Sequence, residues 1–342
     1  MKVKVWNTIQ QLSKERGVAP EAIVKAIEES LRVASSKYFS HNEDVRIFFK
    51  PEKGDLRVYA VKKVSEEPQD EAREISLQEA KKIKPGASVG DEVEIDLPSE
   101  TLGRIAAQAA KQVILQKVRD AEQEKIYEMF APRVGEIVTG VLRRIEANKS
   151  MILEVNRADV LLPYREKLKN EEFRRGDRVK ALIIQVLRDN KGPQVIVSRS
   201  DPKFLAKLLE LEVPEIAEGI INIKNVVRQP GERAKVAVET EEKDIDPIGA
   251  CIGVKGNRIS NISKELAGEK IDIIEWSPDP LTFARAALSP AKVSKVFILN
   301  KEEKRMQAIA SKDQFSLAIG KKGVNVRLAS RLVGWKLEIA QG

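Results

Sequence analysis

Two short glycine motifs offer the clearest chemistry in this chain of 342 residues. The first is Ile252-Gly253-Val254-Lys255-Gly256, and the second is Ile319-Gly320-Lys321-Lys322-Gly323. Both read Ile-Gly-x-x-Gly, and their first glycines stand at positions 253 and 320. A glycine lets the backbone turn sharply and lets a phosphate group approach without meeting a Cβ atom. The pattern therefore favours a phosphate-binding turn that occurs twice.

The residues around each turn suit a nucleotide chain. A helix after the turn offers unpaired backbone N–H groups and a partial positive charge at its first turn. Basic side chains inside and just after each motif add mobile charge, and branched residues such as Ile252, Ile259 and Ile319 offer an apolar floor for bases. We predict that single-stranded RNA binds at Gly253, Val254, Lys255, Gly256, Arg258, Gly320, Lys321, Lys322, Gly323 and Arg327. A plain turn between two helices would explain one such motif, but two motifs with internal lysines favour binding.

Positive charge is unevenly spread along the chain, whose formal net charge is +8. Residues 1–133 carry 23 basic and 23 acidic side chains, whereas residues 134–200 carry 14 and 9, and residues 251–342 carry 16 and 9. The excess lies in the middle of the chain and around the glycine motifs, as is typical of nucleic-acid-binding surfaces. The alternative is the lysine-rich surface of a heat-adapted protein.

Several classes of site are excluded by composition. A single cysteine and a single histidine rule out an internal disulfide, a CxxC site and an HExxH site, and no nucleotide-binding glycine loop is present. We therefore expect no cofactor and no metal, and we expect Cys251 to be a core residue. Glu92, Glu94 and Asp96 fall on one face of a predicted strand, where solvation is the expected role. No apolar run approaches the length of about 18 residues that spans a membrane, so we expect a cytoplasmic chain.

Residues 1–132 predict a mixed α/β domain that ends in a long helix. The expected shorter elements are helices over residues 7–38, strands over residues 45–49, 56–61 and 92–97, and a helix that begins at the capping-box pair Ser76 and Glu79. The long helix is expected to run from residue 98 to about Phe130, before Pro132. Arg104 and Lys111 lie on its basic face, which either contacts a partner or is solvated.

Residues 134–199 predict a small β-barrel. The expected strands cover residues 136–142, 151–155, 158–162, 178–187 and 194–198, which is the rhythm of an OB-type barrel. Barrels of this kind usually stack bases on aromatic rings, yet Tyr164 and Phe173 are the only aromatic residues here. Basic residues are abundant: Arg143, Arg144, Arg165, Lys167, Lys169, Arg174, Arg175, Arg178 and Lys180. We expect weak contact with the RNA backbone, with a purely structural barrel as the alternative.

Residues 201–342 predict two copies of an α-β-β-α-α-β unit. In the first copy, helices are expected over residues 202–211, 246–252 and 257–267, and strands over residues 219–227, 233–239 and 270–275. In the second copy, helices are expected over residues 280–288, 312–319 and 324–333, and strands over residues 295–299, 304–310 and 335–340. A repeat of this size with a Gly-x-x-Gly loop between helices is typical of KH domains, which clamp about four nucleotides each. The linker at residues 277–280 is short, so we expect the copies to dock.

Four further segments carry a resemblance to a known family. They are Ala110-Lys111-Gln112-Val113-Ile114, Phe173-Arg174-Arg175-Gly176-Asp177-Arg178-Val179, Asp246-Pro247-Ile248-Gly249-Ala250-Cys251 and Asn325-Val326-Arg327-Leu328-Ala329-Ser330. Together with the order of the parts, they make the whole chain resemble the NusA family of bacterial transcription termination/antitermination proteins. The resemblance implies an α+β multidomain fold: an N-terminal α/β domain with a long helix (1–132), an S1-type OB barrel (133–200) and two tandem type II KH domains (201–276 and 277–342).

The resemblance also implies a function. The N-terminal domain would bind RNA polymerase near the flap of its β subunit, with Arg104 and Lys111 as possible contacts, while the barrel and KH domains would take nascent single-stranded RNA. The result would be longer pausing, easier intrinsic termination or, with other Nus factors, antitermination. We expect a monomeric factor that is not an enzyme.

Two other functions agree with parts of the pattern. Phosphorolytic exoribonucleases also carry a KH unit and an S1-type barrel, but the part of the chain before the barrel offers no phosphate loop, histidine cluster or metal-spaced carboxylates for a catalytic core. A ribosome-associated RNA-binding protein is the second alternative. Nuclease turnover in magnesium would favour the former, and co-sedimentation with ribosomes the latter.

Overall fold

The computed structural model describes residues 44–50, 55–96, 112, 115–116, 119–188 and 192–342, together with Lys25. The chain divides into two compact units, Met1–Lys125 and Ile126–Gly342. Apart from Lys25, the predicted helices over residues 7–38 lie outside the described residues, as do most of the first half of the long helix and both Arg104 and Lys111.

The first unit contains a four-stranded sheet. Its strands are β1 (Asp44–Lys50), β2 (Asp55–Ser65), β3 (Glu74–Ser76) and β4 (Glu92–Asp96). Strand β2 pairs antiparallel with β1 and β4, and parallel with β3, a short strand that the sequence did not predict. Helix α3 (Leu77–Ile83) begins where predicted, because the Ser76 hydroxyl accepts a hydrogen bond from the Glu79 amide at 3.3 Å. The acidic residues of β4 are exposed, so its predicted solvated face is confirmed.

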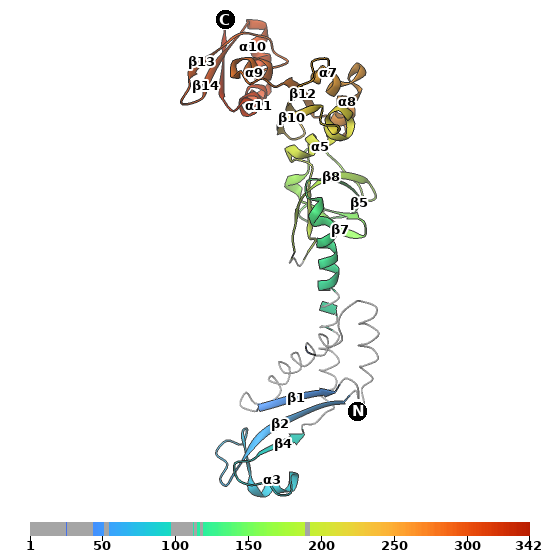
Figure 1. Ribbon diagram of the computed structural model, residues 1–342, viewed down its shortest axis with the longest axis vertical. Helices are drawn as coiled ribbons and strands as arrows, with labels where there is room; N and C mark the ends of the chain where they lie inside the picture. Colours follow the sequence, from blue (N-terminus) through green and yellow to red (C-terminus); the bar gives the residue numbers. More distant parts are fainter. Residues whose placement is uncertain are drawn as a thin grey trace. The chain divides into compact units, whose positions relative to one another are not determined.

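The second unit contains a closed barrel that follows the end of the long helix. Residues 119–130 are helical, and Ala131–Arg133 forms the 3₁₀ turn η2 around Pro132. The barrel strands are β5 (Ile137–Ile145), β6 (Met151–Val155), β7 (Ala158–Leu162), β8 (Arg178–Val186) and β9 (Val195–Ser198). They close in the order β5-β6-β7-β9-β8, so all five predicted strands are confirmed; Figure 1 labels β5, β7 and β8 of this barrel. A Cβ atom at Gly140 would lie 2.9 Å from the Leu153 Cβ, which explains glycine where β5 crosses β6.

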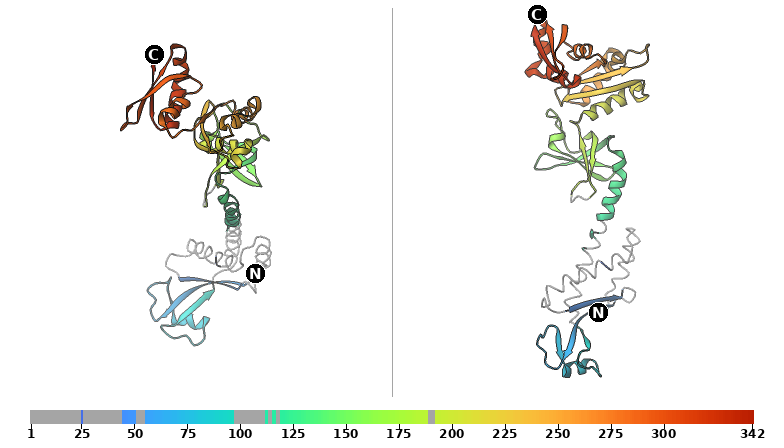
Figure 2. Two further views of the ribbon diagram at one scale, coloured as in Figure 1. Left: turned by 45° about the horizontal axis from the view of Figure 1, so that its top comes forward. Right: turned by 60° about the vertical axis from the view of Figure 1, so that its left-hand side comes forward.

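Two units with the predicted α-β-β-α-α-β order follow the barrel. The first contains α5 (Pro202–Glu212), the short α6 (Pro214–Ala217), β10 (Ile221–Gln229), β11 (Arg233–Thr240), α7 (Pro247–Ile252), α8 (Asn257–Glu265) and β12 (Lys270–Glu275). The second contains α9 (Pro280–Ala287), β13 (Val293–Asn300), β14 (Arg305–Ala310), α10 (Lys312–Ile319), α11 (Val324–Val333) and β15 (Lys336–Gln341). In each unit the middle strand pairs antiparallel with the first and parallel with the last (Figure 2).

An Asp-Pro pair starts three of these helices. Asp201, Asp246 and Asp279 are the N-caps of α5, α7 and α9, and each carboxylate accepts a hydrogen bond from a backbone amide of the first turn. The proline that follows has no N–H group to satisfy and already has the helical φ angle. Hydrogen bonds from Thr282 hold the pKa of Asp279 below its usual value. The start of each helix is thus fixed locally.

The two KH units dock through strand β11, which is buried on both faces. Val236 and its alternate neighbours pack against the helices of the first unit, whereas Ala237 joins the core of the second. Lys235 shares the second face and is fully buried, with its ammonium donating to Asp272 at 3.0 Å and to the Ser289 carbonyl at 2.6 Å. Burial lowers the pKa of Lys235, against the opposing effect of Asp272. The predicted docking is therefore confirmed.

Two buried arginines, Arg199 and Arg228, join the barrel to the first KH unit. Arg199, whose side chain is 2% exposed, binds Glu171 of the barrel at 2.8 Å and Glu265 of α8 at 2.9 Å. Arg228 of β10 pairs with Glu269 at 2.8 Å and also donates to the Arg199 carbonyl at 3.0 Å. Because these charges are buried and fully engaged, breaking the junction would leave uncompensated charges in the interior.

Candidate nucleic-acid interface

The first glycine motif forms a tight turn between α7 and α8. Helix α7 ends at Gly253, whose φ of 76° and ψ of 173° favour glycine, and the 3₁₀ turn η4 (Val254–Gly256) leads into α8. The Gly256 amide donates to the Gly253 carbonyl at 3.0 Å and closes the turn. A Cβ atom at Gly253 would lie 2.8 Å from the Arg258 Cγ, so the close approach of α8 also requires glycine.

The second motif repeats this conformation. Gly320 has φ 74° and ψ 167°, and the turn η5 (Lys321–Gly323) is closed by the Gly323 amide on the Gly320 carbonyl at 3.0 Å. Lys255 and Lys322 both have a φ of 52°, in the left-handed region. The two loops thus share one backbone path, as the repeated spacing predicts.

Each loop ends at the N-terminus of a helix that no side chain caps. Gly256 and Gly323 are the N-caps of α8 and α11, and neither helix has a side-chain cap or an acidic residue in its first turn. A Cβ atom at Gly323 would meet nothing within 4 Å, so this side of the loop is open. Uncapped amides and the helix dipole favour an anion at each site.

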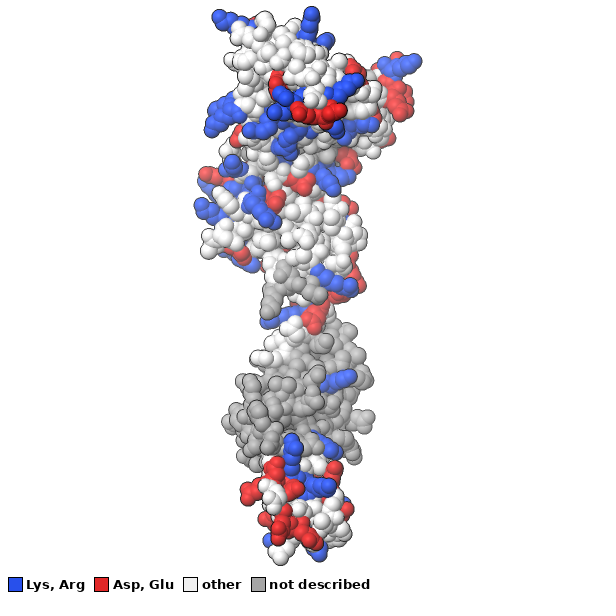
Figure 3. Space-filling model, turned by 90° about the vertical axis from the view of Figure 1, so that its left-hand side faces the viewer, with Lys and Arg blue, Asp and Glu red and all other residues white. Residues whose placement is uncertain are grey.

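The loop side chains add positive charge to this geometry. Lys255, Lys321 and Lys322 are exposed, and the structure records no salt bridge for any of them within its described part. Val254 is 80% exposed and presents an apolar surface beside Lys255. Figure 3 shows Lys and Arg gathered over the KH units and the adjoining barrel on one face. The predicted loop residues are thus brought together in two matching clusters.

Arg258 has a packing contact that the sequence did not predict. Its guanidinium donates to the Ala250 carbonyl at 2.6 Å and to Glu215 at 3.0 Å, and it faces the end of α7 rather than the open side of the loop. Asn325 occupies the equivalent position in the second unit and donates to the Ala318 carbonyl of α10 at 3.0 Å. Both side chains hold the helix before the loop to the helix after it. Alignment of the two motifs on their glycines could have revealed this equivalence.

Arg327 is exposed and joins the two KH units. Its guanidinium donates at 2.9 Å to the side chain of Gln229, the last residue of β10 before the β10–β11 turn. Arg327 lies one turn beyond Gly323 on α11, so it continues the line of positive charge from the second loop towards the first unit. Gln229 was not predicted, because nothing in the sequence indicates that α11 packs beside this turn.

The apolar floor is only partly covered. Ile252 is 36% exposed directly before Gly253, while Ile259 packs against the core of the first unit. Cys251 is fully buried beneath them, and its burial, aided by the charge of Glu215, raises its pKa to about 11. The thiol is therefore a protonated core group, as predicted.

The basic residues of the barrel divide into two groups. Those engaged by an acidic side chain or by a backbone carbonyl are Arg143, Arg144, Arg165, Lys167 and Lys180. A second group is exposed and has no salt bridge to any described residue: Lys169, Arg174, Arg175 and Arg178. The second group is free to meet a phosphate backbone without first breaking an ion pair.

Metal sites and membrane spans are both missing from the described part of the chain. There, no three His, Cys, Asp or Glu side chains are grouped so that they could hold a metal ion. Among these same residues, every helix is too short or too polar to cross a lipid bilayer.

Three family models match the chain in the order of its parts. They are the NusA N-terminal domain at residues 5–124, the NusA-like first KH domain at residues 199–276 and the NusA-like second KH domain at residues 280–342. A solved structure, the N-terminal domain of NusA from Bacillus subtilis, is 42% identical over 36% of this chain and 99% of that chain, with a TM-score of 0.32.

Curated relatives match along nearly the whole length. NusA of Halalkalibacterium halodurans is 45% identical, over 99% of this chain and 88% of the relative. NusA of Bacillus subtilis is 44% identical over 99% and 91%, and NusA of Thermus thermophilus is 40% identical over 98% and 89%. With its OB-like barrel and tandem KH units, this chain belongs to the NusA family of transcription termination/antitermination proteins.

Proposed function

We propose that this chain is an RNA-binding elongation factor that holds nascent RNA while bound to RNA polymerase. Its curated relatives are named transcription termination/antitermination proteins. Such a factor changes no covalent bond; it shifts the balance between paused and moving states by binding one of them more tightly. Pausing, intrinsic termination and antitermination would be outcomes of this one bias.

The paired loops carry the RNA-binding part of the proposal. Each combines an uncapped helix N-terminus with exposed lysines, and each KH unit clamps about four nucleotides. Since the units are docked through β11, the loops present two grips on one body. A single strand that engages both gains affinity without further contacts.

Charge reversal in the loops tests the RNA grip. We expect the double change Lys321→Asp and Lys322→Asp to weaken binding of single-stranded RNA in a filter assay. The change Lys264→Asp with Lys270→Asp is the matched control, because these two lysines are exposed, lie outside the loops and remove the same charge. Equal binding by the loop variant and the wild type, with intact circular dichroism, would exclude the loops as the grip.

We assign polymerase binding to the N-terminal domain, with the four proposed domains at residues 1–132, 133–200, 201–276 and 277–342. The β flap is the proposed contact on the polymerase, and other Nus factors are proposed partners during antitermination. The changes Arg104→Glu and Lys111→Glu should weaken polymerase capture while leaving binding of free RNA unchanged. Polymerase capture equal to that of the wild type would place the contact elsewhere.

We further propose that the factor acts as a cytoplasmic monomer without catalytic activity. Purified protein should not shorten labelled RNA in magnesium with or without phosphate, and turnover would favour the RNA-processing alternative. Pull-down from a lysate should recover polymerase rather than ribosomes, which separates the proposal from the ribosomal alternative.

A further inference from the structure

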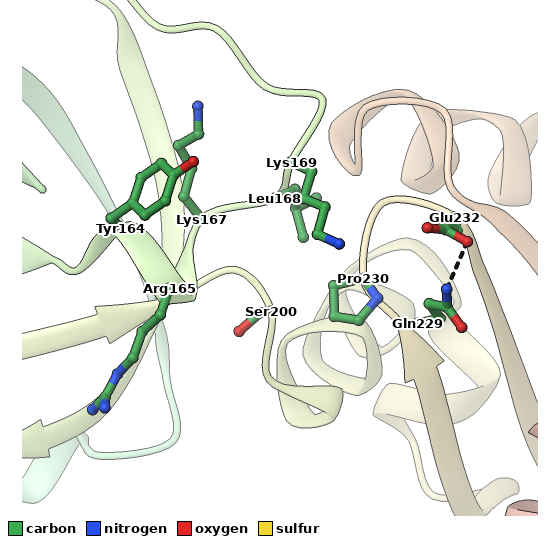
Figure 4. Close-up of a pocket in the computed structure, with 9 residues that line it drawn as sticks. All are labelled: Tyr164, Arg165, Lys167, Leu168, Lys169, Ser200, Gln229, Pro230 and Glu232. Carbon is green, nitrogen blue, oxygen red and sulfur yellow. Dashed lines mark hydrogen bonds between the residues drawn. The ribbon is translucent and has the colours of Figure 1, made fainter. Parts of the chain in front are cut away.

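A hollow of about 370 Å³ lies between the barrel and the first KH unit. Figure 4 shows Tyr164, Lys167 and Lys169 on the barrel side, with Lys169 extended towards Pro230 on the β10–β11 turn and Lys167 pointing away from it. The volume is at the lower end of the range for small-molecule sites, about 300–1,000 Å³. The residues that line it include none of the RNA-binding residues predicted from the glycine motifs.

The walls of the hollow are held by buried contacts. Leu168 is fully buried in its floor, and Asn170 donates to the Gly231 carbonyl at 3.3 Å across the junction. The Gly231 amide in turn donates to Glu269 at 2.8 Å, within the buried pair of Glu269 and Arg228. The hollow is therefore formed before any ligand arrives, which lowers the entropic cost of binding.

Tyr164 gives the hollow an aromatic surface without an evident structural role. The residue is 54% exposed, and it is not part of the buried core of the barrel. The Lys149 ammonium lies 5.7 Å from its ring centroid, which leaves the rest of the ring available. An exposed aromatic ring in a nucleic-acid barrel is suited to stacking on a base, whatever its sequence.

The charge around this ring is positive. Arg165, Lys167 and Lys169 line the hollow, whereas Glu232 is the one acid among the described residues of its lining and already accepts from the Gln229 amide at 2.7 Å. Arg165 is paired with Glu166 at 3.5 Å, and its guanidinium points away from Lys169 (Figure 4), whereas Lys169 has no salt bridge within the described part of the chain. A ligand that fits must therefore combine a flat ring with a neighbouring negative charge.

The hollow adjoins the second KH loop through one hydrogen bond. Gln229, which lines the hollow, accepts a hydrogen bond from Arg327 at 2.9 Å. Arg327 lies one turn after Gly323 on α11. A strand that leaves this loop towards the first unit thus meets Arg327 and then the hollow.

We propose that the hollow binds one base and its adjacent phosphate from the same single strand of RNA that the KH loops grip. Tyr164 stacks on the base, and Lys169 binds the phosphate. This inference rests on the proposed RNA-binding function. It assigns base stacking to Tyr164, one of the two aromatic residues of the barrel segment. A nucleotide supplies both the ring and the charge that the lining requires.

Two RNA lengths test the proposal in fluorescence anisotropy. An RNA of about 8 nucleotides fills both KH clamps, whereas one of about 20 nucleotides adds enough chain for an OB-type site, about 4–16 nucleotides. Tyr164→Ala should weaken the longer RNA about tenfold, the effect of losing one stacked base, and leave the shorter RNA unchanged. Tyr164→Phe should retain wild-type binding of both.

Lys169→Glu should likewise weaken only the longer RNA. Arg157→Glu is its control, since Arg157 is an exposed barrel residue that does not line the hollow. Photocrosslinking of the longer RNA containing 4-thiouridine should label the peptide that holds Tyr164. Wild-type affinity of Tyr164→Ala for the longer RNA, or equal losses for both lengths, would overturn the proposal. The proposed RNA binding by the KH loops is tested separately: it would be contradicted if the loop variants bound the shorter RNA as well as the wild type does.

Discussion

Neutralising the three loop lysines should change the salt dependence of RNA binding by a calculable amount. Lys255, Lys321 and Lys322 are exposed beside two anion-binding turns, so each is expected to contact one phosphate. For single-stranded nucleic acids, each neutralised phosphate adds about 0.7 to the slope of log affinity against log salt. The change of all three lysines to Gln should therefore lower the slope by about 2.1. When the salt concentration rises from about 50 to 200 mM, the affinity of the triple variant should therefore fall by a factor roughly 20 times smaller than that of the wild type.

The assay is a salt titration of an RNA of about 8 nucleotides, long enough for both clamps. The control variant changes Lys243, Lys264 and Lys270 to Gln, because these lysines are equally exposed but lie outside the loops. It has the same net charge as the loop variant, so any difference between the two reports local contacts rather than the general field of the protein. Equal slopes for the two variants would refute the assignment of the phosphates to the loops.

Three further outcomes follow from the geometry. Gly320→Ala should lower stability by about 1–3 kcal/mol and weaken RNA binding, because the added Cβ atom would lie 2.8 Å from the Asn325 Cβ; a thermal melt and the filter assay check both effects. Arg199→Met should lower stability by about 3–5 kcal/mol in urea unfolding, since it leaves the buried Glu171 carboxylate without its cationic partner, and the added change Glu171→Leu should restore part of the loss. Cys251 should resist a thiol reagent at pH 8 in the folded chain and react rapidly in urea, because its pKa is raised to about 11; rapid reaction of the folded chain would contradict its burial.

Local patterns predicted the elements and the loops well. The barrel strands were found because short β-branched segments alternate with polar turns, and the loops because glycine spacing is a property of the backbone itself. Gly253 and Gly320 adopt the conformations that the motif requires. In the first unit, strand β3 was missed, since its three residues are too few to show a period.

Contacts between distant segments could not be predicted from one sequence. Lys235 reads as a surface residue, yet the second KH unit covers its side of β11 and Asp272 satisfies its charge. Arg258 reads as a free cation beside a phosphate-binding loop, but Glu215, which lies far earlier in the chain, engages it. The roles of such side chains depend on how whole units pack together, and one sequence does not indicate which unit covers which face of a strand.

Because the two KH units are docked through β11, the distance between their two RNA-binding loops is fixed. Two KH units joined by a flexible linker would bind RNA motifs at almost any separation, because the linker would adjust. The KH units that are docked through Lys235 and Ala237 hold their loops at one separation. Avidity is therefore gained only when the RNA between two bound motifs matches that separation. Selectivity for a transcript can thus reside in the distance between its two bound motifs, even where each KH unit alone binds many base sequences.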